Sequence, residues 1–240
     1  MMIVFYISQE IGMSEYTVEE VASKIDHAVL KPDQTEQDVR ENAIMCIERG
    51  VASMCVRPCD IKLTADLLKD SSVMTSCVLS FPHGADTTEV KVFQAKRAIE
   101  DGTQEIDMVM NIGQFLSGNY DAVREDIKAV VDVAHAAGIA VKVIQESGFL
   151  TLEQIVIACE LSCEAGADFV KTSTGFNTTS ATPEIVDVMI KTVGTRMKVK
   201  PSGGIRNWET AVAYLEQGAD RLGIGSTVAV LDGGEVEGDY

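Results

Sequence analysis

Residues 161–176 read LSCEAGADFVKTSTGF and contain one complete unit of the pattern that decides the fold. A helical segment ends at Gly166, a short apolar stretch follows, and Lys171 then leads into a turn of hydroxyl residues and glycine. Glycine readily adopts the left-handed conformation that ends a helix and directs the chain into a strand. The stretch therefore predicts a helix-to-strand junction.

The same helix–glycine–strand pattern recurs along the chain. Its other junction glycines are Gly50, Gly102, Gly138 and Gly218. Together with the segments between them they predict strands near residues 24–27, 52–56, 75–81, 105–112, 140–146, 167–172, 197–202 and 220–225. Helical patterns separate these strands; residues 119–137, for example, carry apolar side chains along one stripe. Strands that alternate with helices predict a parallel sheet, and eight units predict an α/β fold of the (β/α)8 TIM-barrel type. A doubly wound open sheet is the alternative.

The length of 240 residues fits one barrel domain, which we expect to span residues 1–240. An extra helix is expected over residues 14–23, before the first strand. Residues 1–13 are expected to be disordered or an N-terminal extension, and residues 232–240 a flexible tail that ends at Tyr240.

Several helix starts carry recognisable signals. Thr35, Thr87 and Thr151 are expected to cap helices with their hydroxyl groups, and Pro183 fits the first turn of another helix. The residues just before these starts would form the loops at the carboxyl ends of the strands, where active sites of barrel proteins lie.

Composition narrows the classes of function. The formal net charge of -17 disfavours nucleic acid and anionic membrane surfaces as partners. No stretch reaches the about 20 apolar residues that span a bilayer, and the apolar start lacks the basic region of a signal peptide. The six cysteines are scattered, with no histidine at metal-ligand spacing. We therefore expect a cytoplasmic protein that needs no metal and no cofactor.

Two lysines carry the chemistry that the sequence indicates. Lys171 and Lys200 each lie in an apolar, strand-like stretch that runs into a glycine- and hydroxyl-rich turn. Burial in a strand disfavours an ammonium and a second cation adds to this, so the pKa of the reactive lysine is expected to fall. A neutral amine attacks carbonyl carbon, which indicates Schiff-base chemistry. Lysines that extend from strand ends into water are the structural alternative.

The turns after these lysines indicate an anion. Residues 172–175 and 202–204 offer backbone N–H groups and hydroxyls, which suit the phosphate of a phosphorylated carbonyl compound.

A series of motifs then occurs in a specific order. The motifs are IDHAVLKPDQT (25–35), ASMCVRP (52–58), VLSFPHG (78–84), EIDMVMNIG (105–113), VKVIQES (141–147), FVKTSTGF (169–176), VKPSGGIR (199–206) and RLGIGS (221–226). From about residue 24 to residue 231 the chain resembles the deoxyribose-phosphate aldolases. This resemblance implies a class I lyase of deoxyribose phosphate catabolism that reversibly cleaves 2-deoxy-D-ribose 5-phosphate to D-glyceraldehyde 3-phosphate and acetaldehyde.

The resemblance also implies roles for single residues. Lys171 matches the lysine that forms the Schiff base, Lys200 the second active-site lysine, and Asp107 the acidic residue of proton transfer. The residues expected to bind substrate and phosphate are Thr172, Gly175, Gly203, Gly204 and Ser226. A barrel with aliphatic outer helices is further expected to form a homo-oligomer, a dimer or a tetramer.

Some positions depart from the usual motifs of that family. Ala28 stands where threonine is usual, Arg57 where asparagine is common, and Gly225 where a second hydroxyl is frequent. Asp26 and His27 could join the proton network or make structural hydrogen bonds, and we expect the latter. Glu146 either orients a lysine or accepts hydrogen bonds from loop N–H groups.

Three other functions compete with the aldolase. A barrel isomerase or synthase would use a carboxylate or histidine base and leave Lys171 to pair with phosphate. A non-catalytic sensor of sugar phosphates would bind its ligand without turnover. A metal-dependent aldolase would need clustered histidines, whereas the three histidines lie far apart in the sequence.

Overall fold

The computed structural model describes residues 16–177 and 181–234. Eight parallel strands form one sheet in the order β7-β6-β5-β4-β3-β2-β1-β8. They are β1 Ile25–Val29, β2 Ser53–Val56, β3 Met74–Leu79, β4 Glu105–Val109, β5 Ala140–Ile144, β6 Phe169–Lys171, β7 Lys198–Lys200 and β8 Leu222–Ile224. A parallel bridge between Ser202 and Gly223 joins the β7 end to β8. The predicted (β/α)8 barrel is confirmed, and the open-sheet alternative is wrong.

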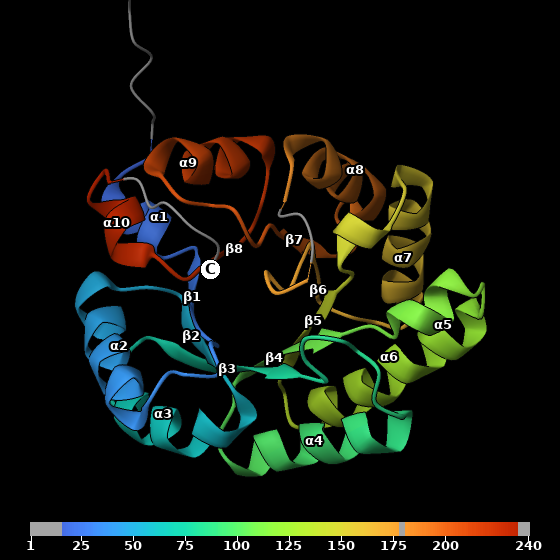
Figure 1. Cartoon of the computed structure of the whole chain (residues 1–240), viewed down its shortest axis with the longest axis horizontal. Helices are drawn as coiled ribbons and strands as arrows, with labels where there is room; N and C mark the ends of the chain where they lie inside the picture. The colour runs from blue at the N-terminus through green and yellow to red at the C-terminus, as the bar shows by residue number, and fades with distance from the viewer. Residues whose placement is uncertain (1–15, 178–180, 235–240) are drawn as a thin grey trace, which may run out of the picture.

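Helices surround the ring of strands, as Figure 1 shows down the barrel. They are α2 Glu36–Arg49, α3 Ile61–Leu68, α4 Thr88–Glu100, α6 Tyr120–Ala136, α7 Leu152–Glu164, α8 Pro183–Val193, α9 Trp208–Gln217 and α10 Thr227–Leu231. Shorter elements are α1 Val18–Ala22, α5 Ile112–Leu116 and the 3-10 turns η1 Pro58–Asp60 and η2 Ser147–Phe149. None of these described helices has the length and apolarity needed to cross a membrane.

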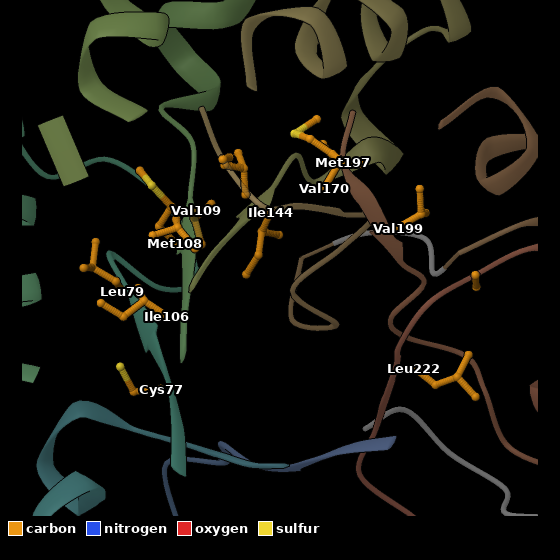
Figure 2. Packing of buried hydrophobic residues seen from close by; sticks show 14 of the residues in the cluster. Cys77, Leu79, Ile106, Met108, Val109, Ile144, Val170, Met197, Val199 and Leu222 are labelled. Carbon is orange, nitrogen blue, oxygen red and sulfur yellow. The ribbon is translucent and has the colours of Figure 1, made fainter. Parts of the chain in front are cut away.

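The core lies between the strands and the helices. Every second residue of a strand points outward, so Ile106 and Met108 of β4 and Val170 of β6 are fully buried in one apolar cluster (Figure 2). Removing such side chains from water is the main favourable term of folding. The inward residues of the same strands are thereby left to face one another.

The helix ends follow the sequence signals closely. All five junction glycines have positive φ angles, from 64° at Gly50 to 110° at Gly218. Thr35 and Thr151 form complete capping boxes, and Pro183 occupies the first turn of α8. The side chain of Thr87 makes no cap hydrogen bond. The third residue of α4 is valine, which has no side-chain group to return the second bond of a capping box.

The strands after β1 are shorter than predicted, whereas β1 continues to Val29, beyond its predicted end at residue 27. β4 ends at Val109 because Asn111 begins α5, where its side chain accepts a 3.1 Å hydrogen bond from the Gln114 amide. The helix expected over residues 14–23 is described as α1, from Val18 to Ala22. The expectations for residues 1–13, for 235–240 and for Tyr240 lie outside the described residues.

Candidate active site

One buried group of charged side chains occupies the interior of the barrel. It contains Asp107 of β4, Lys142 of β5, Lys171 of β6 and Lys200 of β7, and we call these four residues the lysine layer. Register explains why they meet, since Asp107 lies opposite Lys142 and Lys171 lies opposite Lys200 in the parallel ladders. Paired residues of neighbouring strands point the same way, here into the barrel. Each of the four is at most 2% exposed.

Asp107 is the centre of the lysine layer. Its Oδ2 accepts hydrogen bonds from Lys171 Nζ at 2.9 Å and Lys200 Nζ at 2.8 Å, while its Oδ1 accepts one from Lys142 Nζ at 3.0 Å. The structure therefore brings together all three residues that the sequence indicated as catalytic. It adds Lys142, which the sequence reasoning missed. The signal was present, because Lys142 also lies in an apolar strand, AVKVI, but no glycine-rich turn follows it.

A second group lies beside the first inside the barrel. It consists of Asp26, Glu105 and Arg221, which we call the lower layer. Asp26 Oδ2 lies 2.5 Å from Lys200 Nζ, and Glu105 Oε2 lies 2.6 Å from Lys142 Nζ. The Arg221 guanidinium donates to both carboxylates. The structural hydrogen bond expected for Asp26 is present, from the Ser53 hydroxyl at 2.6 Å, and the Asp26 carboxylate also contacts Lys200 directly.

The charged groups of the lysine layer shift one another's pKa values. Burial alone would raise the pKa of Asp107, but the three ammonium groups around it hold that pKa well below its usual range. Burial alone would lower the pKa of Lys171, but the Asp107 carboxylate outweighs this and raises it. The expectation of a lowered pKa for Lys171 is therefore wrong for this arrangement. Before Lys171 can attack a carbonyl, its proton must be transferred.

The three lysines of the lysine layer differ in the number of carboxylates that they contact. Among the described residues, Lys142 contacts three carboxylates, those of Asp26, Glu105 and Asp107. Lys200 contacts two of these carboxylates, and Lys171 contacts only Asp107. Each contact with a carboxylate favours the ammonium form. Lys171 is therefore the lysine of this layer with the fewest carboxylate partners among the described residues.

The loops that follow β6 and β7 contain the expected phosphate ligands. Gly175, Gly203 and Gly204 have φ angles of 82°, 83° and 75°, a conformation that strains other residues. Within the described residues, the amides of Gly203 and Gly204 donate no backbone hydrogen bond. Ser226 immediately precedes α10. These loops thus present N–H groups at the carboxyl end of the barrel.

Thr172 has a different environment from these glycines. Its amide donates to the carbonyl of Lys200, and its hydroxyl both donates to the carbonyl of Ser202 and accepts from the Ser202 amide, each at 3.0 Å. All these groups are buried. Thr172 therefore joins the β6 loop to the β7 loop.

Glu146 fixes the outer part of the β6 loop. Its buried carboxylate accepts hydrogen bonds from the hydroxyl of Thr174 at 2.5 Å and from the amide nitrogen of Asn177 at 2.9 Å. Asn177 also donates to the carbonyl of Pro82 in the loop after β3. Of the two alternatives for Glu146, acceptance of loop hydrogen bonds is confirmed.

The opposite wall of the barrel mouth is apolar. Ala28, Cys55 and Val78 of β1 to β3 form a buried cluster against which Phe81 and Phe176 pack. The two rings meet edge to face with centroids 5.2 Å apart. Burial raises the pKa of the Cys55 thiol, which keeps this wall uncharged. The wall thus places uncharged side chains beside the lysine layer.

Two other positions singled out in the sequence have structural contacts. His27 points away from the lysine layer and bonds to Asn42 and Thr227 through its two ring nitrogens. Arg57 donates to Asp60 and to the carbonyls of Lys31 and Gln34, so it holds the loop after β1. No group of three or more His, Cys, Asp or Glu side chains within the described ranges could hold a metal ion.

Comparison with known proteins identifies the family of this chain. The family model described as DeoC/LacD family aldolase matches residues 20–229. The chain belongs to this family. A deoxyribose-phosphate aldolase of Streptococcus suis is 50% identical over 90% of this DeoC/LacD chain and 97% of its own length. One of Thermococcus gammatolerans is 49% identical over 89% and 96%.

Solved structures of the family have the same barrel. A putative deoxyribose-phosphate aldolase of Coccidioides immitis aligns with a TM-score of 0.87 and 37% identity, covering 92% of this chain and 87% of its own. The deoxyribose phosphate aldolase of Aeropyrum pernix, described as a unique tetramer, aligns with a TM-score of 0.85 and 34% identity. This second alignment covers 90% of this chain and 91% of the Aeropyrum pernix chain.

Proposed function

We propose that this chain reversibly cleaves 2-deoxy-D-ribose 5-phosphate to D-glyceraldehyde 3-phosphate and acetaldehyde through a Schiff base on Lys171. One observation carries the proposal: three buried lysines share the Asp107 carboxylate, and Lys171 has the fewest carboxylate partners among the described residues. The choice of substrate is supported by relatives named deoxyribose-phosphate aldolase, which are about 50% identical to this chain over most of its length.

The first half of the reaction forms the imine. Lys171 loses its proton to solvent, and the neutral amine attacks the aldehyde carbon of the open-chain sugar. The resulting carbinolamine takes up a proton from solvent, loses water and becomes a protonated imine. Lys200 stays paired with the carboxylates of Asp26 and Asp107.

The second half breaks the bond between C2 and C3. Asp107, acting through a water molecule and with help from Lys200, accepts the proton of the C3 hydroxyl. The electron pair of the broken bond moves into the protonated imine, which becomes an enamine, and glyceraldehyde 3-phosphate leaves. Protonation of the enamine at C2 and hydrolysis of the imine then release acetaldehyde and regenerate Lys171.

Phosphate binding is proposed for the loops at the carboxyl end of the barrel. The amides near Gly175, Gly203 and Gly204 and the hydroxyl of Ser226 would hold the phosphate, as loops after the last two strands commonly do in this fold. Thr172 would contribute by holding the two loops together, since its hydrogen bonds already join them.

We also propose a cytoplasmic homo-oligomer, either a dimer or a tetramer. All six thiols are free, which fits a reducing compartment. The tetrameric structure of the Aeropyrum pernix relative supports self-association.

The direct test is a product assay with 2-deoxy-D-ribose 5-phosphate, in the presence and absence of a chelator. Wild type should release both aldehydes at the same rate in either condition. Lys171→Ala should lower kcat by about 10⁴-fold or more while it keeps the wild-type circular dichroism. A single isomeric product would indicate an isomerase, binding without turnover a sensor, and loss of activity with the chelator a metal-dependent enzyme.

A further inference from the structure

Arg221 enters the barrel interior from the residue just before β8. Its guanidinium donates to Asp26 Oδ1 through Nε at 2.8 Å and to Glu105 Oε2 through Nη2 at 2.9 Å. Its side chain is only 11% exposed. Among the described residues, Arg221 makes no hydrogen bond or ion pair with the lysine layer itself, but both of its carboxylate partners contact lysines of that layer.

The two layers together carry an excess of one positive charge. Among the described residues they contain four cationic side chains and three carboxylates. Arginine keeps its charge at every physiological pH. If Lys171 releases its proton to solvent, three cations and three carboxylates remain and the buried group becomes neutral. Without Arg221, the group would already be neutral with all three lysines protonated.

We propose that Arg221 is a positioning residue for the nucleophile: through Asp26 and Glu105 it supplies the excess positive charge that promotes loss of the proton from Lys171. The inference rests on the proposed role of Lys171 in Schiff-base formation. The same logic gives Glu105 the opposite effect, because its charge favours the ammonium form.

The other titratable groups near Lys171 leave this balance unchanged. Cys55 of β2 faces the site as a neutral thiol, since burial raises its pKa. Cys77 of β3 is likewise neutral, with a pKa raised to about 12 by burial. Glu146, beyond β5, is engaged with the loop after β6 through Thr174. Lys198, at the exposed start of β7, lies over the ring of Phe169 rather than in the ion pairs.

The test is the pH dependence of trapping by acetaldehyde and cyanoborohydride, followed as the mass gain at Lys171. The rate should rise with pH as the amine loses its proton. Arg221→Met should move the midpoint upward by about one pH unit, which lowers the rate about tenfold at neutral pH. Glu105→Gln should move it downward by a similar amount. Arg221→Lys keeps the charge and should return the midpoint close to wild type.

Opposite shifts of the midpoint in Arg221→Met and Glu105→Gln would show that the two residues act through their charges. If they only maintained the structure, their replacement would lower the trapping rate without moving the midpoint. Wild-type midpoints in folded Arg221→Met and Glu105→Gln would overturn the inference. If Arg221→Met does not fold, the direction of the Glu105→Gln shift decides alone. Absence of any adduct at Lys171 in wild type would instead overturn the proposed function.

Discussion

The two faces of β4 are equally buried and opposite in character. Glu105 and Asp107 point into the barrel, whereas Ile106 and Met108 point toward the helices, and all four are at most 5% exposed. The outward face gains stability from apolar burial. The inward face gains little net stability, since desolvation of buried ions offsets their attraction. Burial therefore does not distinguish the reactive face of this barrel; the pairing of charges does.

The largest effect should follow from a change on the inward face. Asp107→Asn removes the charge that three lysines share and the group that accepts the proton, so kcat should fall about 10³-fold. Met108→Leu, one position away on the outward face, should leave kcat close to wild type. Steady-state kinetics of both variants measures the contrast. A kcat within tenfold of wild type for Asp107→Asn would contradict the account.

A substitution on the outward face of β4 should lower the stability of the protein rather than its activity. Ile106→Ala leaves a cavity beside Met108 in the fully buried cluster, and should lower the free energy of unfolding by about 2–5 kcal/mol. Its kcat should stay within about twofold of wild type at temperatures where it is folded. Urea denaturation and kinetics on the same preparation give both values. A loss of kcat without a loss of stability would show that the two faces are not separable.

The outward His27 should make stability depend on pH. Burial lowers the pKa of His27 from near 6.5 to about 4, so its contribution is complete above pH 6.5 and is lost as pH falls toward 4. About 2–3 kcal/mol should disappear between pH 7 and pH 4.5. Urea denaturation at several pH values across this range measures how steeply the free energy of unfolding depends on pH. His27→Gln should flatten it, and an unchanged slope in that variant would exclude His27 as the cause.

The smallest effect should come from the helix ends, outside both faces. Thr151→Ala removes the capping box of α7 and should cost about 1 kcal/mol of stability. Thr87→Ala is the matched control, because the Thr87 side chain makes no cap hydrogen bond. Thermal or urea unfolding of the two variants compares them directly. Equal losses would mean that the cap hydrogen bond does not explain the effect.

Much of the fold could be predicted because its signals are local. Each junction glycine, such as Gly166, marks the end of a helix by its own conformational freedom. The start of α5 was missed although Asn111 carries a cap signal, because the apolar residues around it continued the strand pattern. Local patterns thus predict which elements exist better than where they end.

The site was only partly predictable because its contacts are between distant residues. Lys171, Lys200 and Asp107 have recognisable motifs, but no local pattern shows that Arg221 meets Asp26 across 195 positions of sequence. That contact depends on closure of the barrel and on the register of β1 with β8. The raised pKa of Lys171 has the same origin, because it depends on the distance to Asp107.

The most direct test of the central claim is to locate the covalent adduct. Wild type and the variants Lys171→Ala, Lys200→Ala and Lys142→Ala would be incubated with acetaldehyde and borohydride, then examined by intact mass and peptide mapping. The account predicts one ethyl group on Lys171 in wild type and no adduct in Lys171→Ala. An adduct on Lys200 or Lys142 in wild type, or none at all in the folded protein, would contradict it.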